Sequence, residues 1–392
     1  MTKLEQLIEE LCPNGVEFKK VKDVFQRLKG TPITAGKMKE IENPNGEIKV
    51  FAGGKTVINA NEADIPNANI TRVPAVLVQS RGVIDVVYYE KPFTFKNEMW
   101  AYTTDNKTTV KYLYYVLKNN IQHFRDAASG MGSLPQISLP VTEEFYIPIP
   151  PLPVQSEIVR ILDNFTELTA ELTAELTARR QQYEYYNNTL LSFDNAEYKT
   201  LEELCDIVDY RGKTPRKVDD GIFLVTAKNI RKGFIDYDKS KEYISPEDYD
   251  EVMHRGFPKI GDVLITTEAP CGNVAQIDNE NIALAQRVIK YRPKNNNLNS
   301  TFLKYVLLGK EFQDKLERAA TGGTVKGIKG SKLHQLTIPV PSIEEQERIV
   351  AILERFDTLC NDISEGLPAE IEARQKQYEY YRDRLLTFEP AK

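Results

Sequence analysis

The stretch that decides the fold is Tyr183-Glu184-Tyr185-Tyr186, followed by Leu190-Leu191-Ser192-Phe193, because it occurs twice. The second copy reads Tyr378-Glu379-Tyr380-Tyr381, followed by Leu385-Leu386-Thr387-Phe388. A unit repeated at about half the chain length predicts a pseudo-two-fold molecule, and such a molecule suits a target that itself has two halves.

The duplication also extends ahead of these two copies. Ile147-Pro148-Ile149-Pro150 with Gln155 is matched by Ile338-Pro339-Val340-Pro341 with Gln346. Further upstream, Ala127-Ala128-Ser129-Gly130 matches Ala319-Ala320-Thr321-Gly322. The segments between these matches diverge, so we expect two copies of one fold that read different targets.

Two long helices are predicted from apolar side chains that recur at steps of three and four, one over 154–193 and one over about 343–388. Glu-Leu-Thr-Ala occurs three times in tandem from Glu167 to Ala178. Gly366 and Pro368 interrupt the second helix, so a kink or break is expected there. Each helix has one apolar stripe, which predicts an antiparallel pair with coiled-coil-like contacts.

The remaining segments are typical of globular domains with strands and short helices. Strands are predicted within Val73–Tyr89, Phe93–Tyr102, Val263–Thr267 and Val288–Tyr291, and short helices at about 109–125 and 300–318. Proline-rich exits precede both long helices. We therefore predict a mixed α/β (α+β) protein, with a globular domain over 1–150, a helix over 151–194, a second globular domain over 195–341 and a second helix over 342–392.

The net charge of −6 is unevenly distributed. Residues 151–194 carry 3 Lys/Arg and 7 Asp/Glu, and residues 342–392 carry 7 and 12, so the acid is concentrated in the helices. The globular domains are neutral to faintly basic, which permits DNA binding without demonstrating it. No apolar run approaches the ~18–20 residues of a membrane span. The acidic N-terminus does not resemble a signal peptide, and four scattered cysteines indicate reduced thiols in a cytoplasm.

Catalytic motifs are not found in this sequence. It has no Asn/Asp-Pro-Pro-Tyr/Phe motif, and Gly53-Gly54-Lys55-Thr56 has only the tail of a Walker A loop. His123, His254 and His334 are isolated, and no Cys-x-x-Cys spacing suggests a metal site. We therefore predict no catalytic residue and no bound metal.

Candidate DNA-binding residues lie in loops that combine Arg, Lys, Asn or Gln with glycine. Such side chains read guanine and adenine in the major groove, and exposed backbone N–H groups contact phosphate. Each loop is alternatively an ordinary solvated turn. The strongest candidate is the glycine-rich loop 321–329. The full set is Lys29, Thr31, Gln79, Arg81, Ser129, Ser133 and Gln136 in the first half, and Tyr210, Arg211, Lys213, Arg216, Lys217, Lys228, Asn229, Arg231, Thr321, Thr324, Lys326 and Lys329 in the second.

Over its full length the chain resembles the specificity subunit of Type I restriction-modification systems. The resemblance is carried by the Ile-Pro-x-Pro exits, the two Gln-x-x-Ile-Val-x-Ile-Leu helices, the Tyr-Glu-Tyr-Tyr copies and the Thr-Ala-Glu-Leu-type tandem repeat. It implies two target-recognition domains, each reading one half of a bipartite asymmetric DNA site. It also implies a non-catalytic role. Two modification subunits would methylate adenine, restriction subunits would cleave, and S-adenosylmethionine, ATP and Mg would bind those partners, with no cofactor on this chain.

The resemblance further implies that the helices dock the modification subunits and set the gap between the half-sites. The interface candidates are Phe165, Leu168, Leu172, Leu176, Tyr183, Tyr186, Phe356, Leu359, Tyr378 and Tyr381. Alternatively, the tyrosines pack where each helix end meets the opposite globular domain. One Glu-Leu-Thr-Ala block adds about 6 Å of helix, or roughly two base pairs of DNA. The alternative is an ordinary helix lengthened by repeat slippage.

Two rival functions are left open by the residues alone. A standalone two-headed DNA-binding regulator would bind its site tightly without partners. A structural adaptor would bind only proteins, and loss of DNA affinity on mutation of Lys326 and Lys329 would argue against it.

Overall fold

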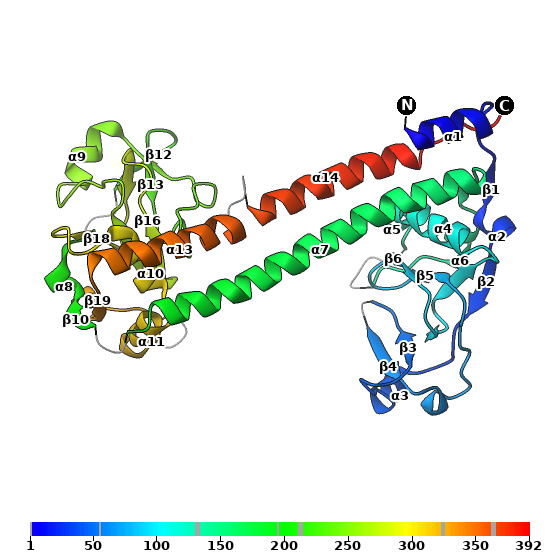
Figure 1. Cartoon of the computed structure of the whole chain (residues 1–392), viewed down its shortest axis with the longest axis horizontal. Coiled ribbons are helices and arrows are strands. Elements are labelled where there is room, and N and C mark those ends of the chain that lie inside the picture. Colours follow the sequence, from blue (N-terminus) through cyan, green and yellow to red (C-terminus); the bar gives the residue numbers. More distant parts are fainter. Residues whose placement is uncertain are drawn as a thin grey trace. The chain divides into compact units, whose positions relative to one another are not determined.

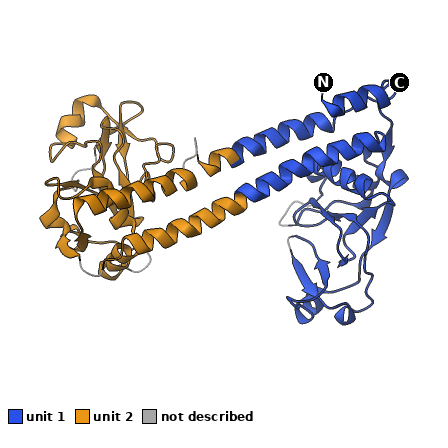
Figure 2. Ribbon diagram, in the orientation of Figure 1, with its two compact units in different colours: residues 1–172, 371–392 blue, residues 173–370 orange. Residues whose placement is uncertain are grey.

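The computed structural model describes residues 2–54, 56–129, 134–193, 196–210, 215–322, 326–361 and 366–392. The chain divides into two compact units, residues 1–172 with 371–392, and residues 173–370 (Figure 2). Each unit therefore joins a globular domain to parts of both long helical segments. Within the described ranges, no helix has the length and apolar character needed to cross a membrane.

The first unit contains a four-stranded sheet in the order β2-β8-β5-β6, a three-stranded sheet β4-β3-β7 and a two-stranded pair β1-β9 (Figure 1). Helix α4 packs on the four-stranded sheet through β5 and β6. The strands are β1 Phe18–Lys20, β2 Gln26–Lys29, β3 Ile48–Phe51, β4 Val57–Ala60, β5 Ala75–Gln79, β6 Asp85–Tyr89, β7 Phe93–Phe95, β8 Trp100–Thr103 and β9 Tyr146–Pro148, and the helices of the globular part are α1 Lys3–Leu11, α2 Val21–Val24, α3 Ala35–Glu40, η1 Glu62–Asp64, α4 Lys107–Asn119, α5 Ile121–Asp126 and α6 Leu139–Glu143.

The second unit repeats this plan. Its four-stranded sheet has the order β11-β18-β15-β16, beside a sheet β12-β14-β13-β17 and a pair β10-β19. The strands are β10 Glu197–Thr200, β11 Cys205–Asp209, β12 Lys217–Val218, β13 Ile222–Val225, β14 Tyr243–Ile244, β15 Val263–Thr267, β16 Cys271–Gln276, β17 Ile282–Leu284, β18 Val288–Pro293 and β19 Thr337–Val340, and the helices are α8 Leu201–Leu204, η2 Pro246–Asp248, α9 Tyr249–Val252, α10 Ser300–Leu308, α11 Lys310–Ala319 and α12 Gly330–His334. The predicted duplication is thus present in the strand order.

The first long helix is continuous, as predicted, but its bounds differ slightly. It is α7, Leu152–Leu190, against the expected 154–193. The second helical segment consists of α13, Ile343–Asn361, and α14, Leu367–Leu385, so it is interrupted where Gly366 and Pro368 predict a break. Each short helix predicted before a glycine-rich loop is in fact two helices, α4 with α5 and α10 with α11. The predicted domain boundaries stay predictions.

The repeated motifs pack into the core of the globular domain to which each helix leads. In the second unit, Leu191 is buried in the core formed with Leu303 and Ile349, and Leu190 packs against that core. In the first unit, Leu386 is buried with Leu113 and Ile158. The core of each domain thus contains side chains from the helix that follows that domain and from the end of the other helical segment. This packing is expected if each helix end meets the opposite globular domain.

The aromatic parts of the repeats make matching contacts within each unit. Phe165 of α7 stacks on Tyr381 of α14, with ring centroids 5.6 Å apart, and contacts Tyr378. In the second unit, Phe356 of α13 stacks on Tyr186 of α7 at 5.4 Å and contacts Tyr183. A residue in the first half of one helical segment therefore meets residues near the end of the other, which is the predicted antiparallel pairing in each unit.

The C-terminal tail is held to the beginning of the first domain by backbone hydrogen bonds. Val16 N–H donates to the Glu389 carbonyl and Ala391 N–H donates to the Val16 carbonyl, both at 2.9 Å. Gly15 has φ +93°, and a Cβ there would lie 2.6 Å from the Pro390 carbonyl oxygen. Only glycine fits both the left-handed backbone and this close approach.

Candidate nucleic-acid interface

The glycine-rich loop of the first domain is closed by a backbone bridge between Ser129 and Gln136. Ser129 N–H donates to the Gln136 carbonyl at 2.9 Å, and Gln136 N–H donates back at 3.1 Å. The next residue, Ile137, donates its N–H to the Ser80 carbonyl just beyond β5, at 3.0 Å. Gln136 also bridges Arg81. The two ends of the loop are therefore fixed to the end of a central strand.

The second domain builds the same frame from different residues. Thr321 and Gly327 exchange backbone hydrogen bonds of 2.8 and 2.9 Å. Ile328 N–H donates to the Thr267 carbonyl at the end of β15, at 3.0 Å, and Gly327 bridges Glu268. Strands β5 and β15 hold the same place in their sheets. The paired Ala-Ala-Ser/Thr-Gly motifs therefore mark the same feature in each domain, a loop that is closed by backbone hydrogen bonds and held at the end of a central strand.

Around the first frame, a groove of about 650 Å³ separates the end of β5 from α3. Arg81, Lys96 and Glu98 supply part of its charged lining, with Lys96 Nζ 2.8 Å from a Glu98 carboxylate oxygen. Leu134, which is 56% exposed, lies on its wall. A concave surface with an arginine and a lysine at a strand end has the donors needed to contact base edges and phosphates.

Several predicted DNA-binding residues have exposed side chains near these frames or elsewhere on the domains. Arg81, Ser129 and Gln136 are brought together at the first frame, and Thr321 and Lys326 at the second, with Lys329 just beyond it at the start of α12. Lys326 forms an ion pair with Glu317. The exposed residues that lie outside the two frames are Lys29, Arg216, Lys217 and Lys228. The structure thus groups five of the predicted residues into two equivalent sites.

Four predicted residues are buried, which corrects their assignment to DNA contact. Thr31 has no exposed surface, and its hydroxyl is hydrogen-bonded to Thr94 at 2.7 Å. Asn229 is also fully buried, with its carboxamide donating to the Asp236 and Ser240 carbonyls at 3.0 Å. Gln79 is 6% exposed, within β5. Thr31 and Asn229 use their polar groups in hydrogen bonds within the domain, and none of the three side chains is available to DNA in this conformation.

Tyr210 is the fourth of these corrections. It is 6% exposed and its hydroxyl donates to the Gly256 carbonyl. Burial raises the pKa of Tyr210 above its usual value, so the phenol keeps the proton that it donates. Sequence composition could not reveal these four assignments, because burial depends on how other segments of the chain pack around each residue.

The remaining predicted residues pair with carboxylates of their own domain or lie outside the described part of the chain. Arg231 is partly buried and lies 3.3 Å from the Asp236 carboxylate, so it braces its own loop. Lys217, at the start of β12, pairs with Glu242 at 2.7 Å. The predictions that fall outside the described residues are Ser133, Arg211, Lys213 and Thr324.

The predicted partner-binding residues on the helices divide into packed and exposed groups. Leu172 is buried, and Phe165, Leu168, Leu176, Tyr183, Phe356, Leu359 and Tyr378 are half-buried. Tyr186 and Tyr381 are each 36% exposed, and their neighbours Tyr185 and Tyr380 are 65% and 61% exposed. The sequence prediction missed this last pair, although the repeat of Tyr-Glu-Tyr-Tyr contained it. The outward tyrosines are the matching aromatic surface that the two units present.

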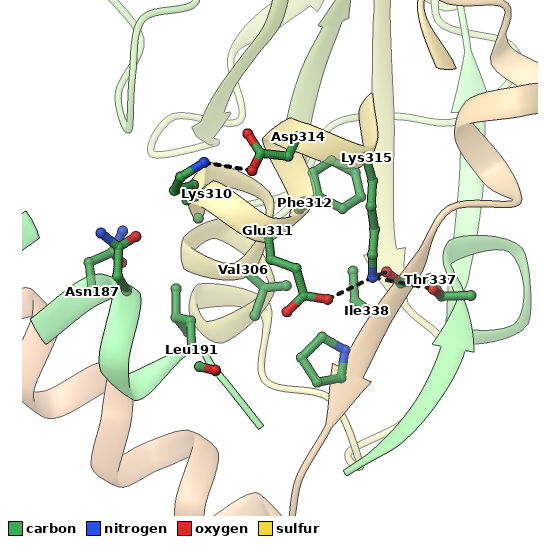
Figure 3. Close-up of a pocket in the computed structure, with 14 residues that line it drawn as sticks. Asn187, Leu191, Val306, Lys310, Glu311, Phe312, Asp314, Lys315, Thr337 and Ile338 are labelled. Carbon is green, nitrogen blue, oxygen red and sulfur yellow. Dashed lines mark hydrogen bonds and ion pairs between the residues drawn. The ribbon is translucent and has the colours of Figure 1, made fainter. Parts of the chain in front are cut away.

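A pocket of about 410 Å³ lies where the end of α7 meets α11 and β19 (Figure 3). Its charged groups interact with one another: Lys310 pairs with Asp314 at 2.6 Å, and Lys315 pairs with Glu311 at 2.8 Å. Lys315 also donates to the Thr337 carbonyl at 3.1 Å. Leu191, from the repeated motif, forms part of the wall. The ion pairs stabilise α11 and its contact with β19, and the burial of Leu191 in the core places the end of α7 on the second domain.

Comparison with known proteins matches the chain twice to one family model, the Type I restriction modification DNA specificity domain. The matches cover residues 13–179 and 194–373. The chain is 40% identical over 310 residues to the Type I restriction enzyme EcoR124I/EcoR124II specificity subunit of Escherichia coli, covering 72% of each chain. It is 34% identical over 313 residues to a putative type I restriction enzyme specificity subunit of Haemophilus influenzae, covering 76% of this chain and 77% of the relative.

Solved structures share the fold at lower sequence identity. The S subunit of a Type I restriction-modification system from M. genitalium superposes with a TM-score of 0.62 at 18% identity, covering 95% of this chain and 96% of the other. A chain from a structure of complex assembly and conformational transition of the type I R-M system gives a TM-score of 0.53 at 16% identity, covering 95% and 98%. At these identities the likeness concerns the fold alone.

Proposed function

The chain belongs to the family defined by the Type I restriction modification DNA specificity domain, and from that premise we propose that its two domains read the two halves of one bipartite DNA site. The chain is a non-catalytic DNA target-recognition subunit of a Type I restriction-modification system. Its role is to bring the DNA-modifying and restricting activities of other subunits to a defined sequence.

The observation that carries the proposed division of labour is the loop frame that occurs once in each domain. Both frames are closed by two backbone hydrogen bonds and tied to the end of the equivalent strand, β5 or β15. Their side chains differ, with Arg81 and Gln136 at positions where the second domain has Glu268 and Gly327. The same backbone with different side chains supports two readers of similar geometry and different base preference.

We further propose that two modification subunits dock on the helical part of the chain. The exposed tyrosine pairs, Tyr185 with Tyr186 and Tyr380 with Tyr381, support this because tyrosine is enriched in protein interfaces and the two surfaces match. Restriction subunits would join the same complex. S-adenosylmethionine, ATP and Mg would bind these partners, with none on this chain, and the assembly would act in the cytoplasm.

The proposal is tested by co-expressing the chain with its modification subunit in a methylation-free host and mapping N6-methyladenine by long-read sequencing. A single motif of two defined halves with a fixed gap is the expected result. A soluble, verified complex that leaves the host DNA unmethylated would contradict it. Replacing Tyr185 and Tyr380 with Ala together should weaken co-purification of the modification subunit, whereas the same change at exposed Tyr146 of β9 should not.

The rival functions give different results in binding assays on the isolated chain. A standalone regulator would retain tight, specific DNA binding without the modification subunit. A protein-only adaptor would show no DNA affinity to lose when Lys329 is changed to Ala. Binding that requires the partner, and that Lys329→Ala weakens, would favour the specificity subunit over both.

A further inference from the structure

A residue just beyond the end of the central strand has opposite charge in the two domains. Arg81 follows β5 and bridges Gln136, and Glu268 follows β15 and bridges Gly327. In both cases the bridge joins the strand end to the residue before the tethered isoleucine, Ile137 or Ile328. Arg81 and Glu268 therefore occupy one equivalent position, and both side chains are accessible there.

A second equivalent position, just before the neighbouring strand, has the reverse charges. The Glu98 carbonyl, ahead of β8, accepts a hydrogen bond from the Ser80 hydroxyl. The Arg287 carbonyl, directly ahead of β18, accepts one from Thr267 N–H at 2.9 Å. Ser80 and Thr267 are the residues that hold the two glycine-rich loops, so Glu98 and Arg287 correspond. The first domain thus presents Arg81 with Glu98, and the second presents Glu268 with Arg287.

Both pairs lie on accessible surface beside the loops. In the first domain, Arg81 and Glu98 line the same groove. In the second, Arg287 Nε lies 3.3 Å from a Glu268 carboxylate oxygen, with the side chains 55% and 43% exposed. The Glu268–Arg287 ion pair is exposed and adds little to stability, so fold stability does not explain the charges at these two positions of the second domain. In the first domain the Glu98 carboxylate pairs with Lys96 of the same groove.

The backbone conformation at Arg287 supports the same conclusion. Its φ is +70°, in the left-handed region that residues other than glycine rarely adopt. Non-glycine residues are held in this conformation where the surrounding structure imposes it, and they cluster at binding sites. The Thr267 amide and hydroxyl both donate to the Arg287 carbonyl, at 2.9 and 3.3 Å, and fix this geometry. The arginine side chain is thereby placed beside Glu268 at the strand end.

From this exchange of charge we infer that the paired positions 81/98 and 268/287 each read one G·C base pair, with guanine and cytosine exchanged relative to the domain that reads them. Arginine donates two hydrogen bonds to guanine O6 and N7, and glutamate accepts one from the cytosine amino group. When arginine and glutamate exchange places on the same backbone, the hydrogen-bond donor and the acceptor presented to the DNA major groove also exchange places. The inference rests on the proposed function and assigns the residues that discriminate within it.

The test exchanges the charges in one domain at a time. The double variant Arg81→Glu/Glu98→Arg gives the first domain the arrangement of the second, and Glu268→Arg/Arg287→Glu does the converse. Arg81→Gln and Glu268→Gln serve as milder variants. Matched controls are Arg72→Gln and Glu251→Gln, which change exposed residues away from the two frames. All are co-expressed with the modification subunit, and N6-methyladenine is mapped.

Each double variant is expected to change the preference at one base pair of one half-site, roughly tenfold or more against the original base. The other half-site serves as an internal control. If a variant complex leaves no methylation, competition binding with duplexes randomised in one half-site decides: loss of preference at one base pair supports the inference, and an unchanged preference at every base pair overturns it.

Two further outcomes would also overturn the inference. A wild-type motif that lacks a G·C pair in either half-site would do so while leaving the proposed function intact. Methylation by all four variants with the wild-type motif unchanged would have the same effect. A wild-type complex that shows no bipartite motif would instead overturn the proposed function, and the inference with it.

Discussion

Deleting Thr173–Leu176 from α7 tests whether this helix sets the gap between the two half-sites. The four residues form one turn-sized block inside a continuous 39-residue helix. Their removal shortens the helix by about 6 Å and rotates the rest of the helix by about 40° beyond a full turn. DNA rises about 3.4 Å and turns about 35° per base pair, so the shortening corresponds to about two base pairs and the rotation to about one.

The expected result is a gap shorter by one or two base pairs, with both half-site sequences unchanged. The rotation is small enough that the apolar stripe through Leu168 and Leu172 continues on nearly the same face. Mapping of N6-methyladenine in a methylation-free host measures the gap directly. Inserting one more Glu-Leu-Thr-Ala block should lengthen the gap by the same amount.

A two-residue deletion, Thr173 with Ala174, is the matched control. It rotates the rest of the helix by about 160° from its original face, so it should abolish methylation because the apolar stripe no longer continues. An unchanged gap after the four-residue deletion, in a soluble complex that still methylates, would refute the idea that α7 acts as a ruler.

Three further predictions concern stability. The Glu157 carboxylate is buried between Arg160 and Lys3, which lower its pKa to about 2, so it stabilises the fold fully above about pH 4.5 and progressively less toward pH 2. Glu157→Gln should cost about 2 kcal/mol in urea unfolding at pH 7, and a constant difference between pH 7 and pH 2.5 would contradict this. Asp262→Ala removes the carboxylate shared by buried Lys290 and half-buried Arg292, and it should destabilise the second unit by about 3–5 kcal/mol. The loss should be seen as faster hydrogen exchange in β15 and β18 but not in β5. Truncation after Phe388 removes the backbone hydrogen bonds of the tail to Asn14 and Val16 and should cost the first unit about 2–3 kcal/mol in thermal unfolding, with unchanged stability counting against the packing described.

The stretches that the sequence predicts well are those whose signal is local. The 3.6-residue period of apolar side chains predicts α7 to within three residues at each end, because a helix satisfies its own backbone hydrogen bonds. Gly366 and Pro368 predict the interruption between α13 and α14 for the same reason. The predicted strand Val263–Thr267 is β15 as observed. The duplicated motifs predict that two domains share one plan.

The candidate site was only partly predictable, because exposure is decided by contacts with other segments of the chain. Thr31 and Asn229 have the right chemistry and the right kind of loop, yet their hydroxyl and carboxamide groups are used by Thr94 and by the Asp236 and Ser240 carbonyls. No local pattern separates these residues from exposed Arg81 and Lys329. Loop composition therefore identifies candidates, and the packing of other segments selects among them.

The sequence by itself determined the repeat, the long helices, the strand-rich domains and the glycine-rich loops. Only the tertiary structure decided that Leu191 and Leu386 are buried in the cores of the domains to which their helices lead. It alone brought Glu98 to the same groove as Arg81 and Arg287 beside Glu268, across 17 and 19 positions of sequence. The physical reason is that periodicity and turn chemistry act over a few residues, whereas sheet order and register place the ends of different strands together.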